Sequence, residues 1–276
     1  MLFARCSRSR EESSIMDLNK TNYFGPEATA KYWSVSQFKA FDRCEASGLA
    51  EARGIYQREE TDALLVGSYV DAFFSGEADE FVEEHRDVMF SKRGGGLLAK
   101  YQKADEIIET ITRQPLMMEY LTSGDTQVIK TAELFGVPWK IKMDVYSDER
   151  IVDLKVVKDF ESIYDKGYGR RSWIEYWGYD VQGAIYQKIE QLATGRDKPL
   201  PFYLVAATKE KVPDVKIIEI PQHILDTALG MVSAKIERFD LIKTGQVEPR
   251  RCETCDYCKR TKIIRAPEVY ELEEVQ

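Results

Sequence analysis

This sequence of 276 residues lacks the features that define several protein classes. No apolar run approaches the roughly 20 residues that a membrane-spanning helix needs, and no segment has the hydrophobic core of a secretory signal. We therefore expect a cytoplasmic protein without a membrane partner. The formal net charge is −8, which excludes coating of nucleic acid through bulk positive charge and leaves DNA contact to a local basic groove.

Histidine chemistry and a phosphate-binding loop are also missing. The two histidines, His85 and His223, stand alone in the sequence, and we assign them no chemistry. The glycines at 94–96 are not followed by the Gly-Lys-Ser/Thr sequence that a P-loop requires. Hydrophobic content of 43% and charged content of 31% are ordinary for a globular protein, and the length suffices for a substantial core.

The most informative stretch is residues 139–158. Each half alternates apolar and polar side chains with period two, which predicts two strands joined by a four-residue polar turn. With this turn, Asp144 falls opposite Asp153, and Lys142 falls opposite Lys155. Like charges directly opposed across a sheet destabilise it, so we expect a divalent cation such as Mg²⁺ between the two carboxylates. A charged surface hairpin would produce the same pattern.

The cysteines form a second informative pattern. Cys252, Cys255 and Cys258 follow the spacing C-x₂-C-x₂-C, which in a cytosolic chain favours metal binding over disulfides. Three thiols leave a tetrahedral site one ligand short, and Cys44 is the obvious fourth, although a buried core cysteine is the alternative for that residue. Cys6 lies in the first few residues, and we expect it to have no structural role.

Further segments carry isolated polar residues on apolar elements. Asp71 is the one acid in an apolar helix predicted at 61–76, where a carboxylate needs a partner or a metal unless it faces solvent. Glu133 lies in a strand predicted at 127–135, which precedes the charged hairpin. Apolar strands predicted at 201–207 and 215–220 extend the sheet, and a long helix is predicted at 224–242.

Aromatic and basic residues interleave between 164 and 179, a composition that fits either DNA contact or a core cluster. This segment contains Arg170 and Arg171. In the helix predicted to begin at Ile174, Gln182 and Tyr186 are four residues apart and therefore share one face.

Taken in order, these motifs resemble those of the PD-(D/E)xK nucleases, and in particular the RecE/RecB-like phage exonucleases that carry an iron–sulfur cluster. The matching motifs are S-x-S-x-F-x-x-F-x-x-C at 34–44, G-x-x-x-D at 67–71, D at 144 with D-x-K at 153–155, Q-x-x-x-Y at 182–186, and the three C-terminal cysteines. Asp71 is a departure, because relatives carry His at that position. The resemblance implies an α/β fold with a central mixed sheet flanked by helices.

The same resemblance implies an exonuclease that hydrolyses phosphodiester bonds of linear DNA during phage or prophage recombination, with a single-strand annealing recombinase as partner. It assigns catalysis to Asp144, Asp153, Lys155, Gln182 and Tyr186, and Mg²⁺ or Mn²⁺ binding to Asp71, Asp144, Asp153 and Glu133. It assigns DNA contact to Lys142, Lys158, Arg170 and Arg171, and a [4Fe-4S] cluster to Cys44, Cys252, Cys255 and Cys258. Zn²⁺ would satisfy the same four thiols.

For domain organisation, we expect a disordered extension at 1–15, a nuclease domain at 16–265 closed by the four cysteines, and a tail at 266–276. Three other functions remain as hypotheses: a single-strand exonuclease of the CRISPR-adaptation type, a nuclease-like DNA-binding module without catalysis, and a zinc-ribbon interaction protein. Some recombination exonucleases form rings, so an oligomer is one option, and duplex and single-stranded DNA both remain candidate substrates.

Overall fold

The computed structural model describes residues 16–59, 61–91, 95–165 and 167–267. The extension expected at 1–15, with Cys6, and most of the expected tail lie outside these residues. The helices are α1 (Pro26–Lys31), α2 (Val35–Arg43), α3 (Glu45–Ala52), α4 (Asp62–Ser75), α5 (Ala78–Glu84), α6 (Arg86–Met89), α7 (Ala99–Thr112), α8 (Pro115–Thr122), α9 (Trp173–Trp177), α10 (Tyr179–Thr194), α11 (Gln222–Lys243) and α12 (Asp256–Arg260). The strands are β1 (Asp125–Leu134), β2 (Val137–Tyr146), β3 (Ile151–Val157), β4 (Ile163–Asp165), β5 (Gly169–Arg171), β6 (Phe202–Thr208) and β7 (Val215–Glu219).

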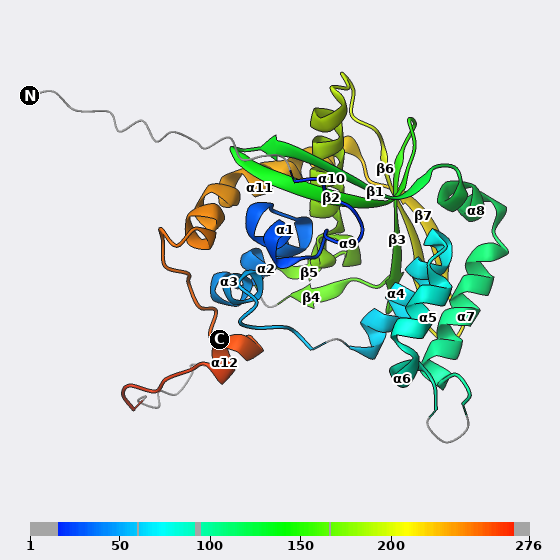
Figure 1. The fold of residues 1–276 in the computed structure, drawn as a ribbon, viewed down its shortest axis with the longest axis horizontal. Helices are drawn as coiled ribbons and strands as arrows, with labels where there is room; N and C mark the ends of the chain where they lie inside the picture. Colours follow the sequence, from blue (N-terminus) through cyan, green and yellow to red (C-terminus); the bar gives the residue numbers. More distant parts are fainter. Residues whose placement is uncertain (1–15, 60, 92–94, 166, 268–276) are drawn as a thin grey trace, which may run out of the picture.

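A mixed five-stranded sheet with the order β1-β2-β3-β6-β7 forms the centre of the fold (Figure 1). Neighbouring strands are antiparallel except β3 and β6, which run parallel. A parallel pair needs a crossover connection, and the segment containing α9 and α10 provides it. β4 and β5 form a separate two-stranded sheet. The α/β fold with a central mixed sheet flanked by helices is therefore confirmed.

Helices cover both faces of this sheet (Figure 1). One face packs against α2, α10 and α11 around apolar side chains such as Ile151 and Phe202. The other face packs against α4, α7 and α8 around a second core that contains Val152 and Val205. Because side chains alternate along a strand, Asp153 and Lys155 lie on the α10 side of β3. Within the described ranges, no helix combines the length and apolar character that a membrane crossing requires.

The predicted turn and register between β2 and β3 are confirmed next to the turn, but the ladder ends before it reaches the predicted charge pairs. The registered pairs between these strands are Val145–Val152 and Tyr146–Ile151, both next to the turn. Beyond them, the Asp144 carboxylate accepts a hydrogen bond from the Leu154 amide (2.9 Å). The ladder pairs do not extend to Asp144 and Asp153, but the two carboxylates lie close enough for their charges to interact. The β1–β2 hairpin turns away from β3 (Figure 1), and the sheet opens where the charged side chains gather.

The helix that was expected to begin at Ile174 is divided into α9 and α10. Gly178 lies between them with φ of 63°, a left-handed conformation that glycine adopts without steric cost. Further along, Gly183 lets α10 approach the sheet, because a Cβ at this position would come within 2.5 Å of the Phe202 ring. This close approach places Gln182 and Tyr186 directly against the strands.

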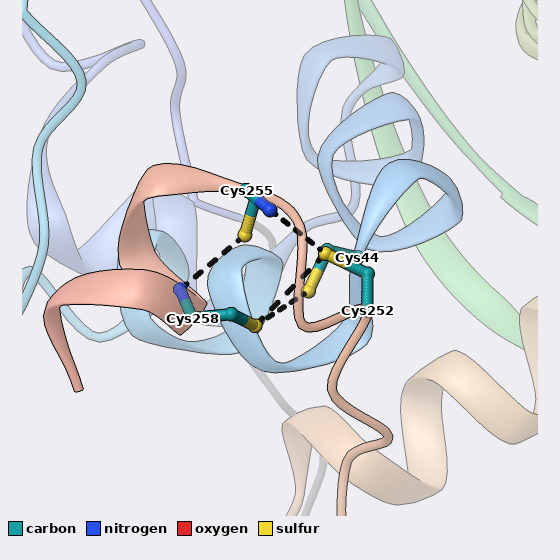
Figure 2. A group of neighbouring side chains, drawn as sticks. All are labelled: Cys44, Cys252, Cys255 and Cys258. Carbon is teal, nitrogen blue, oxygen red and sulfur yellow. Dashed lines mark hydrogen bonds between the residues drawn. The ribbon is translucent and has the colours of Figure 1, made fainter. Parts of the chain in front are cut away.

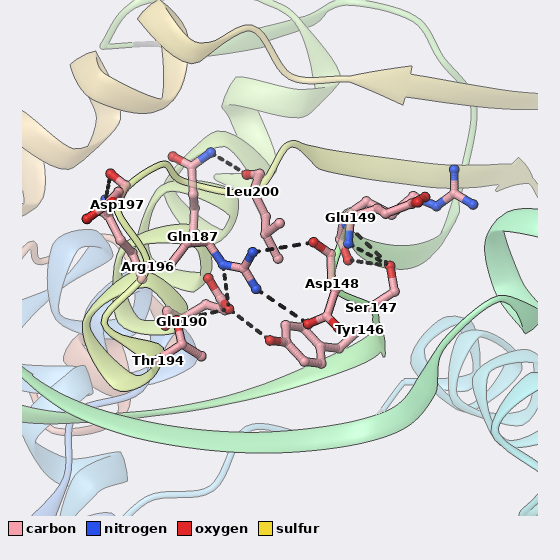
Figure 3. A network of polar contacts seen from close by, with 12 residues as sticks. Tyr146, Ser147, Asp148, Glu149, Gln187, Glu190, Thr194, Arg196, Asp197 and Leu200 are labelled. Atoms are coloured by element: carbon pink, nitrogen blue, oxygen red, sulfur yellow. Dashed lines mark hydrogen bonds and ion pairs between the residues drawn. The ribbon is translucent and has the colours of Figure 1, made fainter.

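A buried polar network fixes the end of α10 to the β2–β3 turn (Figure 3). The Glu190 side chain is fully buried (0% exposed). Its Oε1 accepts hydrogen bonds from the Tyr146 hydroxyl (2.9 Å) and from Arg196 Nε (3.3 Å). Arg196 also donates to the main-chain oxygen of Asp148 (3.4 Å). This network holds the turn that sets the β2–β3 register.

Replacing Arg196 by methionine should leave the buried Glu190 carboxylate without its cationic partner. We expect Arg196→Met to lower the free energy of unfolding by about 3 kcal/mol, the cost of breaking one side of a buried ion pair. Lys198→Met, at an exposed position two residues on, is the matched control. Urea unfolding followed by circular dichroism measures both, and equal stabilities would show that Arg196 does not stabilise the buried carboxylate.

Candidate functional site

The candidate site centres on Asp153, which lies in the middle of β3 and is fully buried (0% exposed). Its Oδ1 accepts a hydrogen bond from Gln182 Nε2 (2.6 Å), and its Oδ2 lies 2.5 Å from Lys155 Nζ. A buried carboxylate is costly unless it is paired and hydrogen-bonded. Asp153 has both kinds of partner, one from its own strand and one from α10.

Two further carboxylates approach Asp153, and we call Asp71, Asp144 and Asp153 the acid cluster. Burial, together with the charges of Asp153 and Asp71, raises the pKa of Asp144 well above its ordinary value. Burial also raises the pKa of Asp71, although the nearby Lys155 and Lys142 oppose that shift. The negative charges therefore repel one another in a poorly hydrated site, and a bound cation would relieve this repulsion.

Lys155 stays positively charged among these acids. Burial disfavours its charge, but the carboxylates of Asp153 and Asp144 outweigh burial and raise the pKa of Lys155 above its ordinary value. Its Nζ also lies 5.4 Å from the centroid of the Tyr179 ring. The ammonium group is thus held in place by its electrostatic partners.

Gln182 and Tyr186 share one face of α10, as predicted, and both also contact strands of the sheet. The Tyr186 hydroxyl donates a hydrogen bond to the main-chain oxygen of Lys142 in β2 (2.8 Å). Burial and the charge of Asp153 raise the pKa of Tyr186 well above its ordinary value, so the hydroxyl keeps its proton. Gln182 contacts Asp153 in β3, and α10 therefore bonds to both strands that border the gap.

Sequence reasoning missed Lys39, which extends from α2 toward the site. Its Nζ donates a hydrogen bond to the main-chain oxygen of Trp177 (2.9 Å), and it lies 5.3 Å from the centroid of the same Tyr179 ring that Lys155 contacts. Burial and the charge of Lys155 lower the pKa of Lys39 to about 8. No local signal marks this lysine, because its partner is 138 residues away in the sequence.

Glu133 is not part of the acid cluster, and the structure corrects its assignment as a metal ligand. It is exposed and pairs with Pro138 beside the turn of the β1–β2 hairpin. Asp144 lies six positions after Pro138 in β2, roughly 20 Å along an extended strand. The β1 residue that does reach the cluster is Gln127, whose Nε2 donates to Asp71 Oδ2 (3.4 Å).

The four predicted DNA-contacting residues have different surroundings. The Lys142 Nζ lies 5.2 Å from the centroid of the Phe24 ring. The Lys158 side chain is 93% exposed and forms an ion pair with Asp159. Arg170 donates a hydrogen bond to Ser162 (3.0 Å), whereas Arg171 donates to the main-chain oxygen of Glu175 (2.9 Å).

The structure brings the four predicted cysteines together (Figure 2), and we call Cys44, Cys252, Cys255 and Cys258 the cysteine cluster. Their sulfur atoms all lie within 4.8 Å of one another, and the four thiols are free rather than disulfide-bonded. Within the cluster, the amides of Cys255 and Cys258 donate to Cys252 Sγ (3.3 Å) and Cys255 Sγ (3.4 Å).

This donor set fits a metal centre. Four convergent sulfur atoms match a tetrahedral Cys₄ site or the ligands of an iron–sulfur cluster, and amide donors to sulfur favour the thiolate form. Cys44 lies where α2 ends and α3 begins, while the other three come from the segment that contains α12. A metal here would join the N-terminal helices to the C-terminal segment.

Known proteins share this fold. Residues 34–261 match the family described as PDDEXK-like domain of unknown function (DUF3799). The chain belongs to this family. It is also similar to the crystal structure of a "Putative exonuclease" from Eubacterium rectale, with 40% sequence identity and a TM-score of 0.86, covering 92% of this chain and 97% of that one.

A second solved structure, that of SSO0001, is 15% identical over 78% of this chain and 91% of its own length. Its TM-score of 0.27 is too low to support any inference. Comparison with curated proteins gives no significant match. Family membership and the Eubacterium rectale structure together confirm the predicted PD-(D/E)xK nuclease superfamily and support a nuclease that hydrolyses phosphodiester bonds. Nucleases of this superfamily usually use divalent metals.

The lowered pKa of Lys39 gives the folded protein a specific pH dependence. Its pKa of about 8 lies below the ordinary 10.5, so the folded state binds this proton less tightly than the unfolded chain. The resulting cost to stability is fully present below about pH 8 and is relieved as the pH rises toward 10.5.

Wild-type stability relative to Lys39→Met should therefore rise between pH 8 and pH 10. Urea unfolding at pH 7, 8, 9 and 10 measures this difference. Lys158→Met, which removes a lysine with a 93% exposed side chain, is the control and should show no comparable trend. A constant difference between wild type and Lys39→Met across this range would contradict the expectation.

Proposed function

We propose that this protein is a metal-dependent exonuclease that hydrolyses phosphodiester bonds of linear DNA, and that it serves end resection in phage or prophage recombination. The observation that carries the proposal is the buried Asp153–Lys155 pair, held by Gln182 beside Asp144 and Asp71 at the opening between β2 and β3. The 40% identical protein from Eubacterium rectale, named a "Putative exonuclease", supports the exonuclease assignment. A single-strand annealing recombinase would be the partner.

The acid cluster has the chemistry for Mg²⁺ or Mn²⁺. Its carboxylates are hard oxygen ligands, and the mutual repulsion that raises the pKa of Asp144 and Asp71 would be relieved by a cation. The main-chain oxygen of Leu154 is a further candidate ligand. A bound divalent cation would lower the pKa of a coordinated water and offset charge at the scissile phosphate.

Lys155 acts in this proposal as a fixed positive charge. Its raised pKa keeps it as an ammonium group at neutral pH, so it donates hydrogen bonds rather than accepting a proton. Placed beside Asp153, it would orient the attacking water and stabilise the negative charge that develops on the phosphate oxygens. Such preorganised charge is most effective in a site that excludes bulk water.

Gln182 and Tyr186 act as positioning residues. The Gln182 amide is engaged with Asp153, and the Tyr186 hydroxyl is engaged with the main chain of Lys142. Both side chains thereby fix the strands that carry the acids, and this role does not require direct contact with DNA. We propose phosphate contact for Lys158, Arg170, Lys142 and Arg171, of which Lys158 is the most exposed.

For the cysteine cluster we propose a [4Fe-4S] cluster, with Zn²⁺ as the alternative for the same four thiols. Its role is structural, because it joins the α2–α3 junction to the C-terminal segment. The α3 residue Glu45 supports the same junction, since it binds the Arg238 guanidinium with two hydrogen bonds of 2.8 Å.

Digestion of end-labelled linear DNA tests the catalytic assignment. With Mg²⁺ or Mn²⁺, the anaerobically purified protein should release label from duplex DNA, and EDTA should prevent it. Asp153→Asn and Lys155→Met should each lower the rate by about 100-fold or more, because they remove charge at the reacting phosphate. Asp197→Asn, at an exposed position, is the matched control.

Full activity in both site variants would remove the site assignment. Digestion of single-stranded DNA in place of duplex would favour the CRISPR-adaptation type of exonuclease. Binding of DNA by folded protein without any metal-dependent cleavage would favour a non-catalytic module.

Loss of a cysteine ligand should release the metal and loosen the fold. We expect Cys258→Ser to lower the bound metal content and to lower the Tm by about 5 °C or more, since metal binding contributes directly to folding. Cys6→Ser, at a cysteine outside the described residues, is the chemically matched control. In the wild-type protein, iron with acid-labile sulfide would support [4Fe-4S], whereas colourless protein with one zinc would support the alternative. An unchanged metal content in Cys258→Ser would contradict the assignment of this cysteine as a ligand.

A further inference from the structure

Gln127 has a backbone conformation that is unusual inside a strand. Its φ is 56°, in the left-handed region that residues other than glycine seldom adopt. The ladder pairs on either side, Thr126–Val145 and Val128–Met143, keep one register, so Gln127 lies opposite Asp144. Such strain persists only where the surrounding structure imposes it, and it is concentrated at functional sites.

The side chain of Gln127 is buried against the acid cluster, and its amide oxygen has no hydrogen-bond partner within the described residues. It is 4% exposed, and its Nε2 donates to Asp71 Oδ2 (3.4 Å). Because the amide nitrogen donates to the Asp71 carboxylate, the amide oxygen is the atom that is left to accept from another group or to bind a cation. That oxygen, Oε1, is buried and has no hydrogen-bond partner within the described residues.

A buried amide oxygen without a partner is unfavourable, and each such atom in a folded protein needs an explanation. The surroundings of Gln127 Oε1 supply such an explanation. The strand is strained at Gln127, which lies opposite Asp144 in the register, its nitrogen donates to Asp71, and its oxygen is left as a buried acceptor beside these acids. Amide oxygens are hard ligands that suit Mg²⁺ and Mn²⁺ in the same way as carboxylates.

We infer that Gln127 contributes its amide oxygen to the divalent-cation site, while its amide nitrogen aligns Asp71 for the same cation. This inference rests on the proposed function and adds a neutral ligand that the sequence motifs do not include. Neutrality matters because three acids already repel one another here, and a fourth carboxylate at this position would face Asp71 without a proton to donate.

Direct measurement of Mn²⁺ binding in the absence of DNA tests the inference, by electron paramagnetic resonance of free Mn²⁺ and by calorimetry. The holoprotein with its cysteine cluster intact is titrated as wild type, Gln127→Leu, Gln127→Glu and Asp153→Asn. Gln127→Leu keeps the side-chain volume and removes both polar atoms. We expect it to weaken Mn²⁺ binding by about 10-fold or more, with no loss of thermal stability, because the unpaired oxygen is removed as well.

Gln127→Glu restores an oxygen ligand and should bind Mn²⁺ at least about 10-fold more tightly than Gln127→Leu. Equal affinities for wild type, Gln127→Leu and Gln127→Glu would overturn the inference. If Asp153→Asn still loses Mn²⁺ binding in that case, the proposed metal site survives and only the role of Gln127 fails. If wild-type protein binds no Mn²⁺ at all, the proposed metal site and the role of Gln127 fail together.

Discussion

The site depends on a carboxylate that is buried in the middle of a sheet. Asp153 has no solvent exposure, and an isolated charge there would strongly destabilise the fold. Lys155 on the same strand compensates the charge, and Gln182 from α10 supplies the hydrogen bond. α10 reaches Asp153 because Gly183 allows it to pack directly on the Phe202 ring. The hydrogen bond that satisfies the buried Asp153 carboxylate therefore depends on the close packing of α10 against the sheet.

The separation of β2 from β3 begins directly beside these charges. Next to the turn the strands pair regularly, but the Asp144 carboxylate then takes the Leu154 amide and the ladder ends. Asp71 comes from α4 while Asp153 faces α10, and the two carboxylates lie near enough for their charges to interact.

Helix α2 connects the two polar centres of the molecule. It carries Lys39 toward the Tyr179 ring beside Lys155, and it ends at Cys44 in the cysteine cluster. Next to that cluster, Glu45 binds the guanidinium of Arg238 and the amide of Arg250, so the cysteine cluster is supported by polar contacts from distant parts of the chain. The position of α2, and with it Lys39, is thus tied to the C-terminal segment.

The sequence by itself determined the features that depend on local spacing. The period of two put Asp153 and Lys155 on one face of a strand, helical spacing put Gln182 and Tyr186 on one face of α10, and C-x₂-C-x₂-C predicted three convergent thiols. Tertiary structure alone decided that Glu133 lies at the far end of the hairpin, that Gln127 takes its place near Asp71, and that Lys39 reaches Tyr179. These placements depend on strand curvature, on one strained φ angle and on contacts between residues more than 50 positions apart, none of which a local pattern encodes.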